Sequence, residues 1–231
     1  CTRGEFDRPV EIPSVQETLV RLAHRMGKLP VLSEPVEESG KRVAIIGAGP
    51  AGLAAAFALS KLGHRVEILE REERAGGACN LIPEHRLDRT VLLRDLEYVL
   101  GSERIDLRLG QTIPDPDDVE GFDAVLVADG LTEPIHLGLP GEEAALYGWD
   151  FLAAPGKMTG AVAVVGGGAV AVDCAVTARR RGAARVEMFC LEKYGEMPLT
   201  GTERAELLEY GIQINGRTRL TAMHGSAGGV A

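Results

Sequence analysis

The chain has 231 residues, of which 45% are hydrophobic and 26% are charged, and its formal net charge at pH 7 is −9. This length can bury the core of one large or two modest domains, and the composition is ordinary for a globular protein. The negative charge argues against nucleic acid as a partner, because phosphate binding requires a basic surface. No apolar run approaches the roughly 20 residues of a membrane-spanning helix, and the first residues show no signal-peptide pattern. We therefore expect a cytoplasmic protein without a membrane partner.

Residues 1–40 contain one predicted helix and a linker. Ser14 and Glu17 have the spacing of a capping box. Apolar residues then recur at helical spacing and predict an amphipathic helix that ends near Gly27: Val15, Leu19, Leu22 and Met26. We expect this apolar stripe to pack against a neighbouring domain. Residues 29–40 are rich in proline, glutamate and serine, which is typical of a linker.

The next segment has the pattern strand, glycine-rich turn, helix and strand. Val43–Ile46 is apolar and β-branched, as in a strand buried on both faces of a parallel sheet. The turn at 47–52 reads G-x-G-x-x-G, and Leu53–Leu62 is rich in alanine and leucine, which predicts a helix. Arg65–Leu69 is a second strand, and Glu70 follows it.

Each of these residue types has a physical role in binding a dinucleotide. Gly47 permits the tight turn, Gly49 lets the backbone approach a pyrophosphate, and Gly52 lets the helix pack closely on the strand. The N–H groups at the start of the helix, together with its dipole, favour negative phosphates. Glu70 can accept hydrogen bonds from ribose hydroxyls. The segment 41–70 is therefore predicted to bind a dinucleotide.

Residues 71–160 are predicted to alternate strands, helices and turns. The expected features are Gly76-Gly77, the segment Ile82-Pro83-Glu84-His85-Arg86-Leu87, a helix at Leu92–Leu100, a strand at Arg104–Leu109, a buried strand at Val125–Ala128 and a turn-rich crossover at Pro134–Gly141.

The opening pattern then returns. Ala161–Val165 is a second predicted buried strand, and 166–171 reads G-x-G-x-x-A, in which alanine still allows close contact of helix and strand. Val172–Arg181 is a predicted helix and Arg185–Cys190 a strand, with Glu192 just after its end. Because the whole arrangement occurs twice, the chain is predicted to bind two dinucleotides.

The cysteines predict no self-contained metal site. Cys1, Cys79, Cys174 and Cys190 form no C-x-x-C pair, so neither a zinc site nor a redox-active vicinal disulfide is indicated. Cys174 and Cys190 lie in apolar surroundings and are interpreted as small buried hydrophobic residues. This usage fits a reducing compartment.

Together these motifs resemble the flavin-binding part of the glutamate synthase small-subunit family, which includes the N-terminal part of dihydropyrimidine dehydrogenase. The resemblance covers essentially the whole chain and rests on GAGPAGLAAA at 47–56, on Gly76-Gly77 with IPEHRL at 82–87, on LPGE at 139–142, on GGGAVAVDCA at 166–175 and on EMP at 196–198. Residues 1–10 are similar to the end of the iron–sulfur segment of that family.

The resemblance implies an α/β fold with two Rossmann-like dinucleotide-binding domains in a glutathione-reductase-like tandem. A short α-helical segment from an iron–sulfur domain would precede them. The expected divisions are 1–40 for that segment and its linker, 41–155 for the FAD-binding domain and 156–231 for an incomplete NAD(H)-binding domain. We expect residues 1–231 to be a piece of a longer polypeptide.

The resemblance also implies the residues that bind cofactors. The FAD site would comprise Gly47, Ala48, Gly49, Pro50, Ala51 and Gly52 at the pyrophosphate, Glu70 and Arg71 after the second strand, and Gly77, Ala78 and Arg86 beside the flavin. The nicotinamide nucleotide would bind Gly167, Gly168, Ala169 and Val170. Cys1 would be a ligand of a 4Fe–4S cluster shared with upstream residues or a partner. No side chain is assigned as a general acid or base, and a solvent-facing or structural role is expected for His85.

The coenzyme is expected to be NADH. Relatives that use NADPH carry arginines after the last strand of the second unit, whereas this chain has Leu191-Glu192. Glu192 would repel a 2′-phosphate and could bond a free 2′-hydroxyl. The adjacent Lys193 leaves NADPH as the alternative.

The function implied is that of an NADH-oxidising electron-transfer subunit, in which hydride passes from NADH to FAD and single electrons pass to iron–sulfur clusters of partner subunits. One alternative is the small subunit of a glutamate synthase. A second alternative is a scaffold that holds FAD and transfers electrons without nicotinamide turnover.

Overall fold

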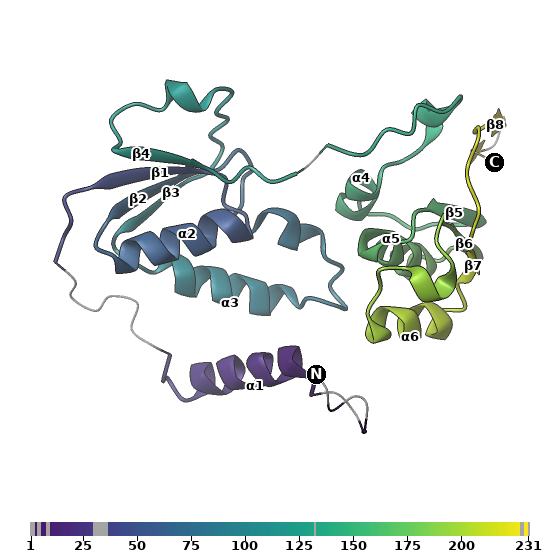
Figure 1. The fold of residues 1–231 in the computed structure, drawn as a ribbon, viewed down its shortest axis with the longest axis horizontal. Helices are drawn as coiled ribbons and strands as arrows, with labels where there is room; N and C mark the ends of the chain where they lie inside the picture. The colour runs from purple at the N-terminus through teal and green to yellow at the C-terminus, as the bar shows by residue number, and fades with distance from the viewer. Residues whose placement is uncertain are drawn as a thin grey trace.

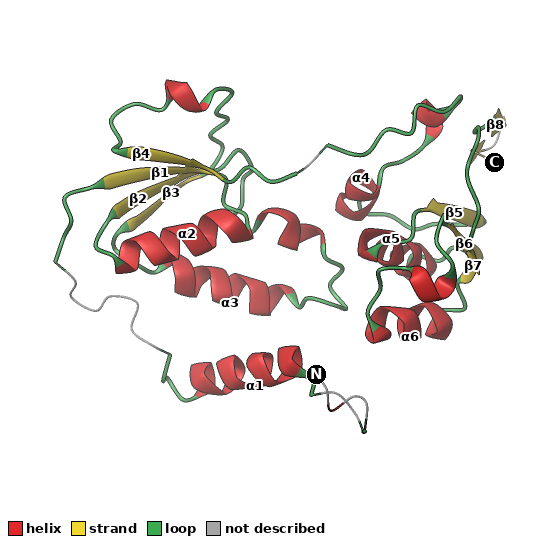
Figure 2. Ribbon diagram, viewed as in Figure 1, coloured by secondary structure: helices red, strands yellow, loops and turns green. Residues whose placement is uncertain are grey.

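A computed structural model of the chain describes residues 3, 6–7, 10–29, 37–131, 133–226 and 229–230. It contains two parallel β-sheets, each covered by helices and joined by a long crossover (Figures 1 and 2). The linker at 30–36 and Cys1 lie outside the described residues. Within the part of the chain that is described, no helix is long and apolar enough to cross a membrane.

The first sheet has four parallel strands in the order β3-β2-β1-β4. The strands are β1 (Arg42–Ile46), β2 (Arg65–Leu69), β3 (Ile105–Arg108) and β4 (Ala124–Val127). The helices α2 (Pro50–Lys61) and α3 (Arg89–Leu100) lie on one face of this sheet (Figure 1). We call this assembly the first unit.

Burial in the first unit follows the position of each strand. Val43–Ile46 is buried throughout because β1 lies between β2 and β4, which confirms the predicted buried strand. β4 was also predicted to be buried, and this prediction was wrong: Val125, Leu126 and Val127 are 37–52% exposed. β4 is an edge strand of the sheet, so it has one neighbouring strand rather than two.

The second sheet has three parallel strands in the order β5-β6-β7. The strands are β5 (Ala161–Val165), β6 (Arg185–Phe189) and β7 (Gln213–Asn215), and the helices are α4 (Gly148–Ala153), α5 (Ala169–Arg180) and α6 (Gly201–Glu209). The helices α4 and α6 both pack on α5, and we call this assembly the second unit. The predicted division at 155/156 stays a prediction.

The buried core of the second unit lies mainly between its sheet and its helices. Val172, Val176, Met188 and Leu207 are fully buried where α5, β6 and α6 meet. β5 was predicted to be buried, but exposed and half-buried residues alternate along it and Val165 is 47% exposed. The correction has a simple cause: α5 covers one face of β5, and among the described residues no strand pairs with its outer edge.

Several helices begin earlier in the sequence than predicted. α2 begins at Pro50 and α5 at Ala169, so each helix starts three residues earlier than predicted, within its glycine motif. For α2 the reason is Pro50, because proline is favoured in the first helical turn. α1 (Ile12–Arg25) is confirmed as a helix, but its N-cap is Glu11 and the predicted capping box at Ser14 is wrong, since Pro13 places the first turn earlier. Its apolar stripe is exposed among the described residues, so the expected packing partner stays a prediction.

Several short elements were not predicted. They are α4, α6, β7, the 3₁₀ helices η2 (Gly77–Leu81), η3 (Pro116–Asp118), η4 (Glu142–Ala144) and η5 (Tyr194–Glu196), and the two-residue strands β8 (Gly225–Ser226) and β9 (Gly229–Val230). For α6 a signal existed: Thr200 and Glu203 form a capping box in which each side chain bonds the other residue's backbone N–H.

Two of the cysteines are core residues, as predicted. Cys174 is 7% exposed and Cys190 is 3% exposed, and both are free thiols. Burial, together with the nearby Asp173, raises the pKa of Cys174 to about 12, so its thiol stays protonated and unreactive near neutral pH.

The crossover between the units is held by one carboxylate. Glu142 accepts hydrogen bonds from the backbone N–H groups of Leu137 (2.7 Å), Gly138 (2.6 Å) and Leu139 (3.1 Å). The hydroxyl of Tyr147 also donates to Glu142, at 3.0 Å. These bonds, led by the one from Leu137, lower the pKa of Glu142.

We predict that Glu142→Gln loosens the crossover, because a neutral amide oxygen accepts these N–H groups less strongly than a carboxylate does. Hydrogen exchange of the amides at 137–139 should accelerate by about tenfold or more. Since the pKa of Glu142 is lowered in the folded state, its protective effect should be complete above about pH 4.5, the ordinary glutamate value. The effect should disappear as the pH falls through the lower folded value. Equal exchange rates in the two proteins at pH 7 would contradict the assignment.

Candidate dinucleotide-binding sites

The first glycine turn lies where the strand order of the first sheet reverses. The chain passes from β1 to β2 and β3 on one side and later places β4 on the other side of β1, which is where open α/β sheets bind ligands. Gly47 has a φ of +105°, and a Cβ atom there would overlap the carbonyl oxygen of Ala128 after β4. A Cβ atom at Gly52 would overlap the Gly47 carbonyl oxygen and lie 3.2 Å from Cγ2 of Ile45. Only glycine fits both positions.

A second loop approaches the first turn. The N–H of Gly76 donates to the Ala48 carbonyl oxygen at 2.8 Å. Gly77 has a φ of +50°, and a Cβ atom there would lie 2.8 Å from Cα of Gly49. Ala78 follows as an exposed residue of η2. The predicted FAD residues at 47–52 and 77–78 are therefore neighbours in space.

The first helical turn of α2 is open to solvent beside this loop. Gly49 is the N-cap of α2, and Pro50 and Ala51 are exposed residues of its first turn. The first N–H groups of a helix have no partner within the helix, so they are available to an anion.

Glu70 is held directly against the turn. It is 6% exposed, and its Oε2 accepts the N–H of Ala48 at 2.7 Å while Oε1 accepts the N–H of Glu72 at 2.9 Å. A carboxylate has about four acceptor positions, so each oxygen keeps capacity for a ribose hydroxyl. Arg71 is exposed and lies 3.4 Å from Glu72. The ribose contact of Glu70 and the cofactor contact of Arg71 stay predictions.

The second glycine turn repeats this geometry. Gly168 is the N-cap of α5, whose first residues are Ala169 and the half-exposed Val170. A Cβ atom at Gly167 would lie 2.7 Å from Oε2 of Glu192, while Gly168 has open space around it. The turn, the start of the helix and the carboxylate after the second strand are thus adjacent, as the repeated motif predicted.

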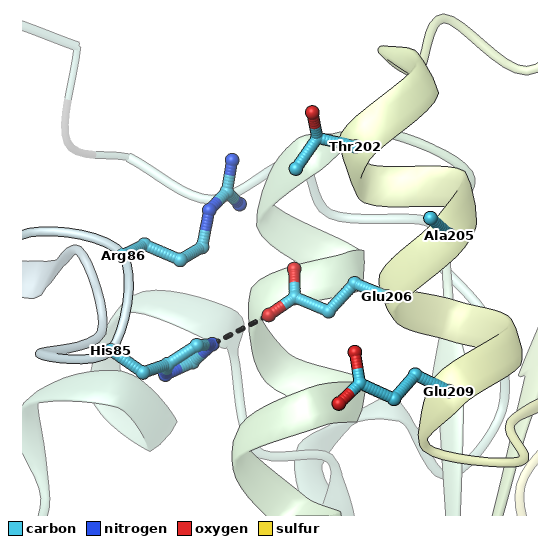
Figure 3. A pocket seen from close by; sticks show the side chains of 6 residues that line it. All are labelled: His85, Arg86, Thr202, Ala205, Glu206 and Glu209. Carbon is cyan, nitrogen blue, oxygen red and sulfur yellow. Dashed lines mark hydrogen bonds and ion pairs between the residues drawn. The ribbon is translucent and has the colours of Figure 1, made fainter. Parts of the chain in front are cut away.

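Arg86 lies between the two units. Its Nη1 donates to Asp173 of α5, and its Nη2 donates to Glu203 of α6 at 3.1 Å. The neighbouring His85 pairs with Glu206 of α6 at 2.8 Å (Figure 3). The predicted contact between Arg86 and flavin stays a prediction.

The three carboxylates of this group were not among the predicted site residues. No sequence motif links His85 and Arg86 to Asp173, Glu203 and Glu206. These residues come together only because the two units pack against each other. Burial raises the pKa of Asp173, although Arg86 opposes the shift. Burial alone would raise the pKa of Glu203, but the hydrogen bonds from Thr200 and the charge of Arg86 lower it.

A hollow of about 410 Å³ lies beside this group rather than at either glycine turn. His85 and Arg86 line it on one side, and Thr202, Ala205, Glu206 and Glu209 of α6 line it on the other (Figure 3). Among the residues that the structure describes, no cluster of histidine, cysteine and acidic side chains is arranged to hold a metal ion. Cys1 lies outside those residues, so its proposed cluster ligation stays a prediction.

Comparison with known proteins agrees with this geometry. The profile of the pyridine nucleotide-disulphide oxidoreductase family matches residues 41–230. The chain is 33% identical to the β subunit of an NADP(+)-dependent formate dehydrogenase from Moorella thermoacetica, over 100% of this chain and 38% of that subunit. It is 32% identical to the NADPH glutamate synthase small chain of Bacillus subtilis, over 82% of this chain and 42% of the small chain. It is 34% identical to the NADH glutamate synthase of Schizosaccharomyces pombe, over 89% of this chain and 10% of that enzyme.

The chain thus spans less than half the length of these relatives. Among solved structures, a 2-naphthoyl-CoA reductase superposes with a TM-score of 0.69 at 19% identity, over 87% of this chain and 31% of the other. Thioredoxin reductase of Lactococcus lactis superposes with a TM-score of 0.61 at 20% identity, over 82% of this chain and 69% of the other. These likenesses confirm the α/β fold with Rossmann-like units. By its sequence, the chain belongs to the pyridine nucleotide-disulphide oxidoreductase family.

Proposed function

We propose that this chain is the FAD-containing, NADH-oxidising electron-transfer part of a multi-subunit iron–sulfur enzyme. The observation that carries the proposal is the presence of two glycine turns, each followed by a helix and each beside a carboxylate, in one chain. A protein with two such sites can orient one cofactor against another. Membership of an NAD(P)H-dependent oxidoreductase family supports the same reaction class.

The first glycine turn fits FAD. Gly47, Gly52 and Gly77 have no room for a side chain, because a Cβ atom at each would press on neighbouring backbone atoms. These glycines keep the backbone of 47–52 free of side chains that would block a pyrophosphate. The start of α2 provides N–H groups and a favourable dipole, and Glu70 provides the carboxylate for a ribose. FAD bound there would supply hydride acceptance and single-electron release, chemistry that the side chains of the protein lack.

The second glycine turn fits a nicotinamide nucleotide, and we favour NADH. The carboxylate of Glu192 lies beside Gly167, so we expect it to meet the ribose of a nucleotide bound at the start of α5. A 2′-phosphate in that position would meet a negative charge in place of a positive one. The relatives are divided, since their names specify NADH in the fission yeast enzyme and NADPH in the B. subtilis small chain.

The relatives' names support the proposal that the protein works with partner subunits. The similar proteins include a β subunit and a small chain, and this chain spans less than half of each. We infer that electrons leave for iron–sulfur clusters, one of them held in part by Cys1, and then for partner subunits. The small subunit of a glutamate synthase is the second candidate, favoured by 32–34% identity to such enzymes.

Rapid mixing of the reduced coenzyme with the oxidised protein tests the proposal. Under anaerobic conditions NADH should bleach the visible absorption of bound flavin. A protein that holds flavin yet shows no bleaching with NADH or NADPH would instead be the electron-transferring scaffold without nicotinamide turnover. Formation of glutamate from 2-oxoglutarate and glutamine by the protein with its co-purifying partner would identify the glutamate synthase.

We predict that Gly77→Ala weakens FAD binding by about tenfold or more. Alanine at a φ of +50° costs about 1–3 kcal/mol of backbone strain, and its Cβ would press on Gly49 of the pyrophosphate turn. Flavin retained after gel filtration measures the loss. Gly211→Ala is the matched control, because Gly211 has a φ of +61° with open space around it in the second unit. Wild-type flavin content in Gly77→Ala would contradict the assignment.

We predict that NADH is preferred over NADPH by about tenfold in kcat/KM, equivalent to about 1.4 kcal/mol. Glu192→Gln should reduce this preference, because it removes the charge that repels a 2′-phosphate. Glu187→Gln serves as control, since Glu187 pairs with Arg185 on β6 rather than facing the glycine turn. The rate of flavin bleaching at several concentrations of NADH and of NADPH gives the kcat/KM value for each coenzyme. A wild-type preference for NADPH would refute the role of Glu192.

A further inference from the structure

The contact between the units is dominated by one group of charged side chains. His85 and Arg86 belong to the loop that follows Gly76-Gly77 in the first unit. Their partners in the second unit are Asp173 of α5 and Glu203 and Glu206 of α6. We call these five residues the inter-unit cluster (Figure 3 shows three of them). The side chains of Asp173, Glu203 and Glu206 are 12%, 6% and 14% exposed, so their charges are poorly hydrated.

The charges in this group depend on Arg86. One guanidinium bonds two carboxylates, which its forked geometry allows and a lysine ammonium would reproduce less well. Glu206 is paired with His85, and Glu209 lines the same hollow. Without Arg86, Asp173 and Glu203 would remain partly buried without a counter-charge, and the second unit would lose its main ionic contact with the first.

Both sides of the inter-unit cluster are fixed to elements that build the glycine turns. Asp173 lies one helical turn, about 6 Å, beyond Ala169 at the start of α5. On the other side, Arg89 donates to the carbonyl oxygens of Cys79 (3.0 Å) and Ile82 (2.6 Å), which orders the loop between Gly77 and Arg86. A shift at Arg86 would therefore change the relative position of the two turns.

The crossover and the remaining contacts constrain the relative position of the units less than the inter-unit cluster does. In the described part of the crossover, Leu131 and Ile135 are each 86% exposed and Leu137 is 51% exposed, so these three side chains do not pack against either unit. The end of the crossover does make a contact, since the N–H of Met223 donates to the Pro140 carbonyl oxygen at 2.8 Å. Beyond the inter-unit cluster, the units meet mainly where α4 contacts η2.

We propose that Arg86 and His85 are positioning residues that hold the second unit in the orientation needed for hydride transfer. This inference rests on the proposed function. The inter-unit cluster sets the limiting rate of flavin reduction and leaves coenzyme affinity unchanged, because neither residue belongs to the second glycine turn.

The test compares Arg86→Met and Asp173→Asn with the wild-type flavin-loaded full chain. Both variants should lower the limiting rate of flavin reduction by NADH, by about tenfold to a hundredfold for a misplacement near 1 Å. The dissociation constant for NADH should not change. The double variant should be no slower than Arg86→Met alone, since the two residues act through one contact. Small-angle X-ray scattering should show a larger radius of gyration for Arg86→Met.

Two further variants complete the experiment. Arg86→Lys keeps the charge and should restore part of the rate. Arg65→Met is the matched control, because Arg65 is exposed and pairs with Glu38 at the opposite end of β2, away from the second unit; it should reduce flavin at the wild-type rate.

The inference is overturned if Arg86→Met keeps the wild-type rate and radius. It is equally overturned if Arg86→Met is slow while Asp173→Asn is normal, because Arg86 would then act on the flavin itself. If NADH fails to bleach the wild-type flavin, the proposed function fails. The scattering comparison then still decides whether the inter-unit cluster holds the units together.

Discussion

The closeness of three backbone segments at the first glycine turn is the constraint on which the rest of the structure depends. The end of β1, the start of α2 and the residue after β4 converge so tightly that a Cβ atom at Gly47 or Gly52 would overlap a neighbouring carbonyl oxygen. This convergence exposes the N–H groups of α2 at the point where the strand order reverses. Without this convergence, the loop at Gly77 and the carboxylate of Glu70 would not lie beside the same turn.

The two glycine turns differ in how their acids are held. Glu70 is fixed by two backbone N–H groups, one of them from the turn itself, so its orientation is set before any ligand binds. Glu192 instead occupies the space that the missing side chain of Gly167 leaves open. A pre-oriented acid suits a cofactor that stays bound, and this is one reason for proposing FAD in the first unit and an exchanging nicotinamide nucleotide in the second.

Local pattern predicted the parts of the structure that depend on local chemistry. The strands at 65–69 and 161–165 have the predicted bounds, and both glycine turns precede helices. Burial was predicted less well: β4 and β5 have the apolar composition of central strands but lie at sheet edges, and only the strand order determines this. The capping box at Thr200 could have revealed α6. No sequence pattern could have paired Arg86 with Asp173 and Glu203, since that contact requires both units to be folded and docked.

This distinction separates binding from catalysis in the molecule. Each glycine turn is a complete structure within its own unit, so each could bind a nucleotide whether or not the units were aligned. Hydride transfer requires two bound rings to stack, and therefore depends on the relation between units. In the described residues that relation depends largely on one guanidinium facing two weakly hydrated carboxylates, beside the His85–Glu206 pair and the contact of α4 with η2. Loss of one partner of the guanidinium would have a high cost. On the proposed function, the glycine turns that would bind the cofactors differ from the side chains that would orient the two units, and only the turns follow from the motifs.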